Sequence, residues 1–354
     1  MHRYAFLATG CLNRNASFVR LRELGFALAN RSVDVHFIID ETEYNSSLAE
    51  GLGPARTHLV PGGSRPMRLV QRRRILDRLN VSGVHILNPQ PLNTCSAMML
   101  SVPVTCDWDE LLSVRERPWW RQPTDLLAES VGRRIARLNV VASRYLQDVM
   151  QQRYGVSCLY LPYAPYLPEM SSTANPFIHP TAVYVGNLMP DYDHDLIVDA
   201  WEVLKLKGVE IDLSICGAGP LLQDVRRDVA RRGLDRVHIE GYVSGQPLVD
   251  RLVHAHVLLL PIRDTPGNRA RCPSKTFAYM QARRPVIANP VGEVKEALGE
   301  VATYVSASPE AFASAVEATV VAKRLPDVAY PRQQTWQDLG DGLIASLERC
   351  GVFH

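Results

Sequence analysis

The chain has 354 residues, of which 46% are hydrophobic and 21% charged, and it carries 39 Lys and Arg against 37 Asp and Glu. At about 100–200 residues per domain, this length predicts two domains, and the composition is that of a folded protein rather than a disordered one. A net charge of +2 excludes a strongly basic chain, so any basic binding site must be a local patch.

The cysteines are odd in number, and no two form a C-x-x-C pair. They are Cys11, Cys95, Cys106, Cys158, Cys216, Cys272 and Cys350. This usage predicts reduced thiols in a cytoplasmic protein, without a zinc site. No apolar run reaches the ~18–20 residues that span a bilayer, and the first ten residues are too short and polar for a signal peptide.

The N-terminal half opens with an apolar run at residues 4–9, an amphipathic stretch, and a second buried run at 33–39. This is the strand–helix–strand opening of a parallel, doubly wound sheet. We predict further strands at 57–60, 84–87, 104–106, 139–142 and 158–161, and helices at 67–79 and 124–138.

Residues 162–180 hold five prolines and the run SSTAN, which favours a linker. Strands and helices alternate again from 182 to 288, which predicts a second Rossmann-like half. The expected domains are residues 1–168, a linker at 169–180, a second domain at 181–330 and a closing segment at 331–354. Ligands of such sheets bind at the carboxyl ends of the strands, so we expect the site in a cleft between two facing domains.

Four blocks of the second half follow one another in a recognisable order: YVGNL at 184–188, ICGAGP at 215–220, VHIEGYV at 237–243, and PSKTFAYM at 273–280 followed by RPVIA at 284–288. In this order they resemble the donor domain of glycosyltransferase family 4. A single G-x-G would be a weak signal, whereas four ordered blocks over a third of the chain are a strong one. Residues 336–347 resemble the closing helix of that family, which crosses back to the N-terminal domain.

The resemblance implies the α/β fold called GT-B, with two Rossmann-like domains facing across an interdomain cleft. It implies a glycosyltransferase of the hexosyltransferase type, which moves a sugar from a nucleoside-diphosphate sugar to an acceptor hydroxyl. We expect a UDP-sugar donor, retention of configuration, and no metal or other cofactor. A sugar-nucleotide epimerase of the same architecture is disfavoured, since we find no acid/base pair of histidine and carboxylate.

The departing diphosphate needs cations and backbone N–H groups to neutralise its charge. Lys275 begins a predicted helix, where N–H groups also face outward, and is the best candidate for a phosphate contact. Arg271 and Arg269 precede it on a predicted loop and are candidates for a forked phosphate contact; the alternative is a plain basic loop. The remaining donor-site candidates are Gly10, Arg14, Gly186, Asn187, Gly217, Gly219, Tyr242, Val243, Ser274 and Thr276. At least one of the glycines is open to a purely structural interpretation.

The chain departs from the family pattern at four positions. Asn187 and Tyr192 stand where the family carries Arg and Lys on the diphosphate, and Ala270 and Ala278 stand where it carries two glutamates. Either the phosphate contact has moved to Lys275, Arg269 and Arg271, or the chain is a catalytically silent relative that acts as a binding or scaffold protein.

In the first half, Asp107 and Asp109 follow a predicted strand and are candidates for the acceptor site. An inverting enzyme would use one as a general base, whereas in a retaining enzyme they would orient the acceptor. The D-x-D spacing also resembles a metal motif of another architecture, which the fold pattern disfavours. The alternative is capping and salt bridges.

Residues 65–79 form a basic, imperfectly amphipathic helix, and residues 117–121 read RPWWR. The resemblance implies contact of such a helix with anionic lipid, and the aromatic, basic loop is typical of interfaces or sugar-stacking sites. Together they favour a lipid-linked or anionic acceptor. The alternative is a solvated face and a loop anchored by buried tryptophans. Nucleic acid is disfavoured as a partner, because no aromatic platform accompanies the charge. We therefore expect a bacterial, cytoplasmic protein, peripheral at the inner membrane face; the sequence predicts no oligomeric state.

Overall fold

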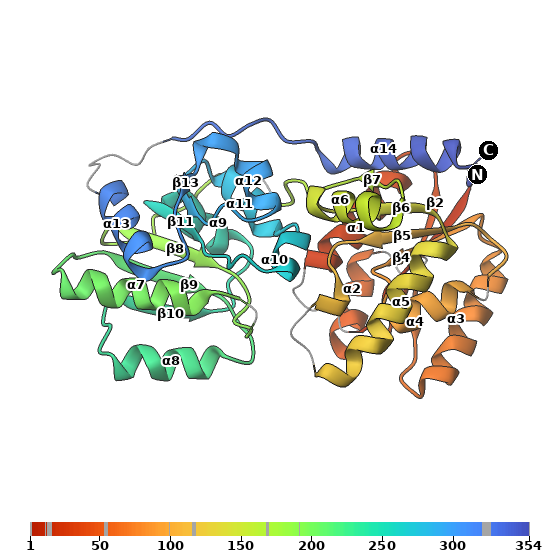
Figure 1. The fold of residues 1–354 in the computed structure, drawn as a ribbon, viewed down its shortest axis with the longest axis horizontal. Helices are drawn as coiled ribbons and strands as arrows, with labels where there is room; N and C mark the ends of the chain where they lie inside the picture. The colour runs from red at the N-terminus through yellow and green to blue at the C-terminus, as the bar shows by residue number, and fades with distance from the viewer. Residues whose placement is uncertain are drawn as a thin grey trace. The chain divides into compact units, whose positions relative to one another are not determined.

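The structure is a computed structural model of the chain, and it describes residues 2–10, 12, 16–52, 56–98, 100–114, 118–167, 170–190, 192–320 and 327–353. The chain divides into two compact units. Unit 1 consists of Met1–Ala164, Ala270–Cys272 and Gln334–His354, and unit 2 of Pro165–Arg269 and Pro273–Gln333. Each unit is built on one sheet with helices on both faces (Figure 1).

The sheet of unit 1 has seven parallel strands in the order β3-β2-β1-β4-β5-β6-β7. The strands are β1 (Arg3–Leu7), β2 (Asp34–Asp40), β3 (Thr57–Val60), β4 (Gly83–Leu87), β5 (Val104–Trp108), β6 (Ala136–Val141) and β7 (Leu159–Tyr160). The central strands are continuous apolar runs because helices cover both of their faces. These helices are α1 (Ala16–Ala29), α2 (Glu43–Leu52), α3 (Arg65–Leu79), α4 (Pro91–Met98), α5 (Gln122–Ile135) and α6 (Arg144–Tyr154), with 3-10 turns at Leu112–Val114 and Trp119–Arg121.

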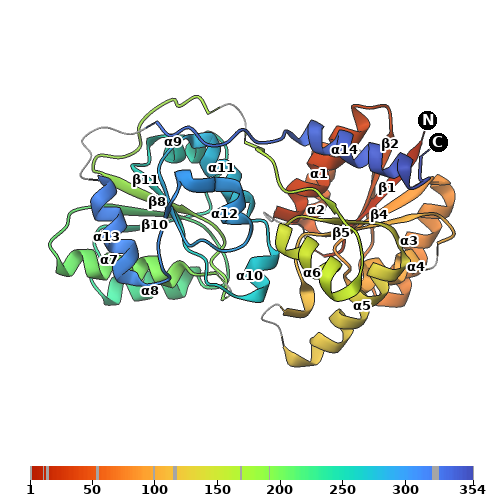
Figure 2. The ribbon, with the colours of Figure 1, turned by 45° about the horizontal axis from the view of Figure 1, so that its top comes forward.

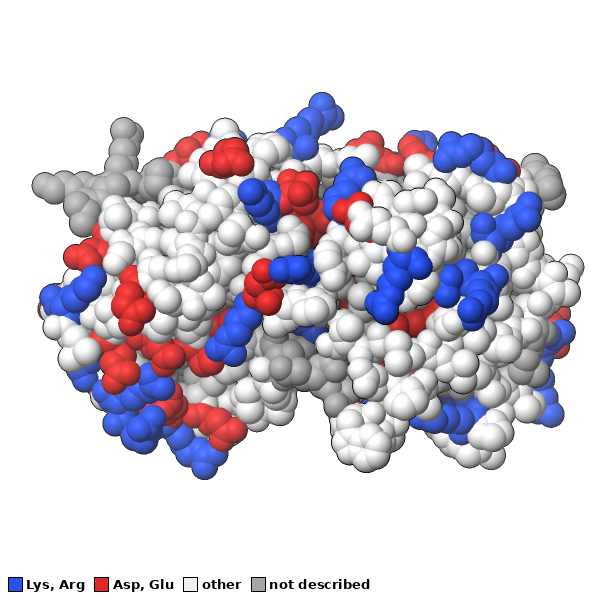
Figure 3. All heavy atoms as spheres, in the orientation of Figure 1, with Lys and Arg blue, Asp and Glu red and all other residues white. Residues whose placement is uncertain are grey.

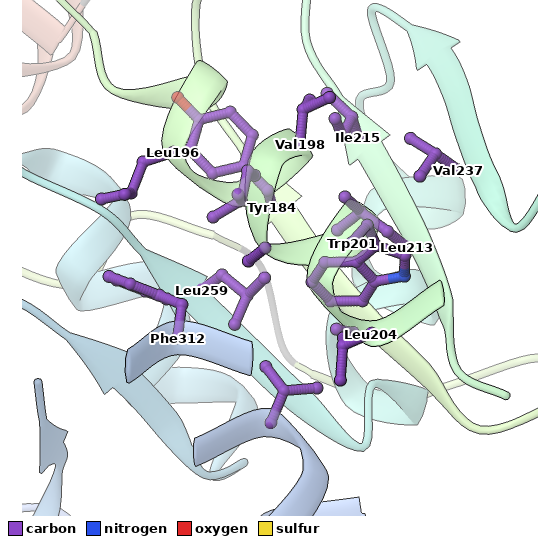
Figure 4. Close-up of a cluster of buried hydrophobic side chains, with 14 of the residues drawn as sticks. Tyr184, Leu196, Val198, Trp201, Leu204, Leu213, Ile215, Val237, Leu259 and Phe312 are labelled. Carbon is purple, nitrogen blue, oxygen red and sulfur yellow. The ribbon is translucent and has the colours of Figure 1, made fainter. Parts of the chain in front are cut away.

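Unit 2 has six parallel strands in the order β10-β9-β8-β11-β12-β13. They are β8 (Thr181–Val185), β9 (Asp212–Cys216), β10 (Val237–Gly241), β11 (Val257–Leu260), β12 (Val286–Ala288) and β13 (Thr303–Tyr304). The helices are α7 (His194–Leu206), α8 (Leu222–Arg231), α9 (Gln246–His254), α10 (Pro266–Ala270), α11 (Ser274–Ala282), α12 (Glu293–Leu298) and α13 (Pro309–Val320). Trp201 from α7, Leu259 from β11 and Phe312 from α13 meet in its core (Figure 4).

The last helix, α14 (Trp336–Arg349), belongs to unit 1 and lies along α1, as both ribbon views show (Figures 1 and 2). A capping box fixes its start, because Thr335 and Asp338 satisfy each other's backbone N–H groups. The two helices approach closely at Gly340, where an added Cβ would lie 2.4 Å from Cβ of Ala27. Arg31 and Asp341 close the contact at the surface, 2.7 Å apart.

Several predicted boundaries shift in the structure. The helix expected at 67–79 begins at Arg65, because Pro66 suits the first turn, where its missing N–H costs nothing. The helix expected to reach residue 138 ends at Ile135, because Ala136 is extended and opens β6. In the expected linker, the backbone N–H and hydroxyl of Thr173 donate to Asp250 of α9 at 2.9 and 2.8 Å, so this segment is tied to unit 2. Of the helices described, none combines the length and the hydropathy needed to cross a membrane.

We expect Gly340→Ala to lower the free energy of unfolding by about 1–3 kcal/mol, because the new methyl group forces α14 away from α1. Gly342→Ala is the matched control on the same helix. Its Cβ would lie 3.9 Å from Leu161, an ordinary contact, so the higher helix propensity of alanine should leave stability unchanged or raise it by up to ~1 kcal/mol. Urea denaturation of the two variants measures both values, and equal destabilisation would contradict the close-packing account.

Candidate functional site

The carboxyl ends of β8 and β9 meet at the edge of the unit 2 sheet where ligands of such folds bind. The loop after β8 begins at Gly186, whose N–H donates to the carbonyl of Cys216 at 3.1 Å. An added Cβ at Gly217 would lie 2.0 Å from the carbonyl oxygen of Gly186, and one at Gly219 would lie 2.3 Å from that of Leu188. Gly217 and Gly219 are therefore needed so that the two strand-end loops can pack, whatever else they contact.

Lys275 lies beside these loops, in the first turn of α11. Its Nζ is 3.4 Å from the hydroxyl of Tyr184 and 4.4 Å from the centre of that ring. An added Cβ at Gly186 would lie 2.7 Å from the same Nζ. The Tyr184 ring packs in the apolar core while its hydroxyl points out of the cluster (Figure 4). The lysine ammonium thus lies where the first strand of the unit ends and where a helix N-terminus presents its N–H groups.

Tyr279 holds α11 in place on the sheet. Its hydroxyl accepts a hydrogen bond from the N–H of Val185 at 2.8 Å and donates one to the carbonyl of Leu259 at 3.2 Å. The phenol is fully buried, and burial raises its pKa, so it stays neutral and keeps both bonds. The N-terminus of α11, with Lys275, is thereby fixed against β8 and β11.

An acidic segment near Lys275, which contains Asp193 and Asp195, pairs with Arg263. The sequence analysis did not identify this arginine. Arg263 contacts Asp193 at 3.0 Å and Asp195 at 2.6 Å, and its backbone N–H also donates to Asp193. Burial raises the pKa of Asp193, and Arg263 opposes this shift. Arg263 follows shortly after the buried strand β11, so the rule that polar residues at strand ends form sites could have found it.

Other predicted donor residues lie around the same edge. Ser274 bonds to the phenol of Tyr166, which is near Tyr242, and burial raises the pKa of Tyr166. The side chain of Tyr242 is exposed, Asn187 and Val243 are half-buried, and Thr276 is buried with no hydrogen-bond partner for its hydroxyl among the described residues. Thr276 is therefore less accessible to a ligand than Ser274 and Lys275, which are half-buried.

Of the loop expected to carry Arg269 and Arg271, residues 266–270 form the short helix α10, and the chain passes between the two units at its end. Arg269 belongs to unit 2 and forms a forked ion pair with Asp264, with one branch at 2.6 Å. Arg271 belongs to a three-residue segment of unit 1, which Ser143 binds through the carbonyl of Ala270 at 2.8 Å. Ala270 and Ala278, where the resemblance implies glutamates in the family, are both buried.

In unit 1, Gly10 follows β1 with a φ of +86°, and no atom would lie within 4 Å of an added Cβ. Its N–H donates to Asp40 at 2.7 Å. Asp40 also binds Arg68 at 2.8 Å and Arg72 at 3.0 Å, both from α3. Two arginines of the basic helix α3 therefore point toward the protein interior and bind the aspartate that holds the Gly10 loop. The other arginines of α3 are more exposed. Arg14 falls outside the described residues.

The two candidate carboxylates at the end of β5 have different environments: Asp107 lies in the strand and Asp109 just after it. Asp107 is fully buried and forms a forked ion pair with Arg20, at 2.7 and 2.8 Å, with His85 at 3.1 Å. Burial by itself would raise its pKa, but Arg20 and His85 lower the pKa to about 2. This arrangement is a structural ion pair, which was the alternative interpretation, and it leaves Asp107 no exposed surface for an acceptor.

Asp109 lies near the surface of unit 1, with 7% of its area exposed. It accepts hydrogen bonds from Ser17 at 2.7 Å and Tyr163 at 3.3 Å, and Asn88 also binds it. Of the two aspartates it is the one that keeps some exposed area. No group of three or more metal-binding side chains is found among the described residues.

The tryptophans before α5 are exposed, so the alternative interpretation, in which buried tryptophans anchor this loop, is wrong. Trp119 exposes 83% and Trp120 57% of its area, and Leu126 and Leu127 in α5 are exposed as well. The guanidinium of Arg121 lies 5.0 Å from the centre of the Trp120 ring. Apolar and basic groups thus share one exposed stretch of unit 1.

Comparison with known proteins places this site in a recognised domain. Residues 179–320, less than half of the chain, match the family described as Glycosyl transferases group 1. This stretch contains Gly186, Lys275 and Arg263. The chain therefore carries a glycosyltransferase domain, and the predicted enzyme class is confirmed. No curated protein matches the sequence.

Solved structures with similar folds align over nearly the whole chain. Anabaena Alr3699/HepE in complex with UDP-glucose is 13% identical, with 99% of this chain and 96% of that chain covered and a TM-score of 0.73. The pneumococcal O-GlcNAc transferase GtfA, in complex with UDP and GlcNAc, is 9% identical, with 99% of both chains covered and a TM-score of 0.72. A glycosyltransferase from Rickettsia africae is 12% identical, with 99% and 93% covered and a TM-score of 0.66. At these identities the matches show the fold, and they confirm the predicted α/β class of the GT-B type.

We expect Asp107→Asn to lower the free energy of unfolding by about 3–5 kcal/mol, because it leaves the buried guanidinium of Arg20 without its counter-charge. Asp77→Asn is the control, since it breaks an exposed ion pair with Arg73 on α3 and should cost at most about 0.5 kcal/mol. Since the folded pKa of Asp107 is below its ordinary value of 3.8, its contribution is complete above about pH 4 and is lost as the pH falls toward 2. Denaturation from pH 7 to pH 2 checks both statements, and an Asn variant as stable as the control would refute the structural role.

Proposed function

We propose that the chain transfers a sugar, of the hexose type, from a nucleoside-diphosphate sugar to an acceptor hydroxyl, with UDP as the favoured nucleotide. One observation carries the proposal: the ammonium of Lys275 lies at the Gly186 loop and at the start of α11, inside the segment that matches the glycosyltransferase family. The solved proteins with this fold include complexes with UDP-glucose and with UDP and GlcNAc, which supports UDP as the first nucleotide to test.

In the proposed reaction the bond between the anomeric carbon and the diphosphate oxygen breaks, and its electron pair stays on the departing diphosphate. Lys275 and the N–H groups of the first turn of α11 stabilise that negative charge. The acceptor oxygen forms the new bond to the anomeric carbon, and its proton passes to the oxygen of the departing diphosphate. The positive charge comes from the protein, so we propose a reaction without a metal.

Arg263 supports this role by its electrostatics. It binds both Asp193 and Asp195, two carboxylates that would otherwise repel a diphosphate beside Lys275. The family's Arg and Lys are replaced by Asn187 and Tyr192, so we propose that Lys275 carries more of the phosphate contact than it does in the family pattern. We propose a retaining reaction, which needs no general base, with Asp109 orienting the acceptor. Asp107 keeps its structural pairing with Arg20.

We expect Lys275→Gln to weaken UDP binding roughly 10–100-fold, because a charge-assisted contact to a phosphate contributes about 1.5–3 kcal/mol. Lys275→Arg should retain more affinity than Lys275→Gln. Lys295→Gln, which removes an exposed lysine of α12, is the control and should bind as the wild type does. Isothermal titration with UDP, GDP, ADP and dTDP measures the affinities.

The titration also separates the enzyme from a silent relative. A protein that binds none of the four nucleotides would reject the proposed function and favour the binding or scaffold alternative. If the wild type and Lys275→Gln bind UDP equally, only the phosphate contact assigned to Lys275 is rejected, and the proposed function is not.

For the acceptor we propose a lipid-linked or anionic molecule presented at the inner membrane surface, with Trp119, Trp120, Leu126 and Leu127 entering the interface. Tryptophan is suited to this position, since its ring is apolar and its N–H can remain hydrated. Arg121 and the exposed arginines of α3 supply attraction to anionic headgroups.

Trp119→Ser combined with Trp120→Ser should reduce sedimentation with phosphatidylglycerol vesicles by about tenfold, because two exposed aromatic rings no longer enter the lipid. Ile178→Ser combined with Leu206→Ser is the control, since it removes two exposed apolar side chains of unit 2. Both double variants should bind UDP normally. If the tryptophan variant sediments like the control, the membrane-surface acceptor is contradicted.

A further inference from the structure

A basic groove lies in unit 1 at the amino-terminal ends of β6 and β7. Its volume is about 630 Å³, and its lining comes from the end of α5, the starts of the two strands and the end of α14. It is therefore at the edge of the sheet opposite to the carboxyl ends, where Gly10 and Asp109 lie. The groove takes no part in the proposed sugar transfer.

Four arginines line this groove: Arg133, Arg134, Arg137 and Arg349. Basic side chains gather over the region of α5, α6 and α14 on the face shown in Figure 3. No aspartate or glutamate is among the lining residues, and no ion pair links any of the four arginines to a carboxylate in the described part of the chain. The groove thus holds positive charge that no neighbouring side chain neutralises.

The contacts given for these four guanidinium groups are with neutral partners: carbonyls, hydroxyls and an aromatic ring. Arg137 donates to the carbonyl of Cys350 at 3.0 Å, and Arg349 donates to the hydroxyl of Ser346 at 2.8 Å. Arg133 lies 4.0 Å from the centre of the Tyr154 ring, and Arg134 bonds to Ser130. An arginine has five N–H donors, so each keeps donors for a ligand while its orientation is restricted.

The helix ends reduce this charge without removing it. Arg133 and Arg134 lie in the last turn of α5 and Arg349 in the last turn of α14. Each helix C-terminus carries roughly −0.5 of an elementary charge, so the two ends together offset about one of the four positive charges. Interaction with the two helix C-termini therefore offsets only part of the positive charge of the four arginines.

The cysteines of the groove do not point to redox chemistry. Cys158 and Cys350 both line it, but burial raises the pKa of Cys158 to about 11. That thiol stays protonated near neutral pH, and the protonated form is neither a nucleophile nor a metal ligand. The arginines are the groups that define the chemistry of the groove.

We propose that this groove binds an anion that carries two or more phosphate groups. The arginine fork matches phosphate oxygens, and the uncompensated charge exceeds what a single carboxylate would neutralise. A volume of about 630 Å³ is within the usual range of small-molecule sites, ≈ 300–1,000 Å³. The ligand joins Arg349 of α14 to the arginines of α5 and β6, so binding strengthens the attachment of the closing helix to the sheet.

Tripolyphosphate is the probe, titrated into the full chain in the presence of saturating UDP and, in parallel, into Lys275→Gln. We expect both proteins to bind it and to gain thermal stability with increasing concentration. Arg134→Glu combined with Arg349→Glu reverses two charges that are hydrogen-bonded to Ser130 and Ser346 and should weaken binding at least tenfold. Arg226→Glu combined with Arg332→Glu makes the same charge change on exposed residues of unit 2 and should bind as the wild type does.

Cardiolipin–phosphatidylcholine vesicles, whose cardiolipin carries two phosphate groups, form the second arm and distinguish a lipid headgroup from a soluble phosphate as the source of the anion. They are tested in the Trp119→Ser, Trp120→Ser background, which removes the other proposed lipid contact. Loss of vesicle or tripolyphosphate binding in the groove variant, with unchanged UDP binding, supports the site. Equal affinity of the groove variant and its control for both probes would overturn it, as would a wild type that binds neither. Because UDP binding is measured separately, failure of this site and failure of the proposed transferase are distinguishable.

Discussion

The close packing of the loops after β8 and β9 is the constraint on which the donor side of the structure depends. With a Cβ at Gly217 only 2.0 Å from the carbonyl of Gly186, any other residue there would push the two strand ends apart. The same glycine loop leaves room for the ammonium of Lys275, which Tyr279 positions by fixing α11 to the sheet. The packing of the glycine loops and the position of the Lys275 ammonium therefore depend on each other.

Charge is distributed differently in the three polar regions of the molecule. Asp107 and Arg20 neutralise each other in the core of unit 1, and Arg263 pairs with Asp193 and Asp195 in unit 2 and offsets part of their charge. The arginine groove has no such partner among its lining residues. An internal ion pair supports stability but leaves little affinity for a ligand, whereas uncompensated charge favours an anion. This difference separates the structural aspartate from the groups proposed to bind phosphate.

The sequence could predict the strands and the glycine blocks, because apolar runs and G-x-G turns are local signals. It could also predict that Lys275 begins a helix, since Pro273 stands just before the start of α11. It could not predict that Asp107 is buried, because its partner Arg20 is 87 residues away. The exposure of Trp119 and the pairing of Arg263 with Asp193 likewise depend on tertiary contacts that no local pattern encodes.

A crystal structure of the chain with UDP tests the central claim most directly. The account predicts a diphosphate oxygen within about 2.7–3.2 Å of Nζ of Lys275, with the diphosphate at the N-terminus of α11 and beside Gly186. A well-ordered UDP whose phosphates contact neither Lys275 nor the first turn of α11 would contradict it.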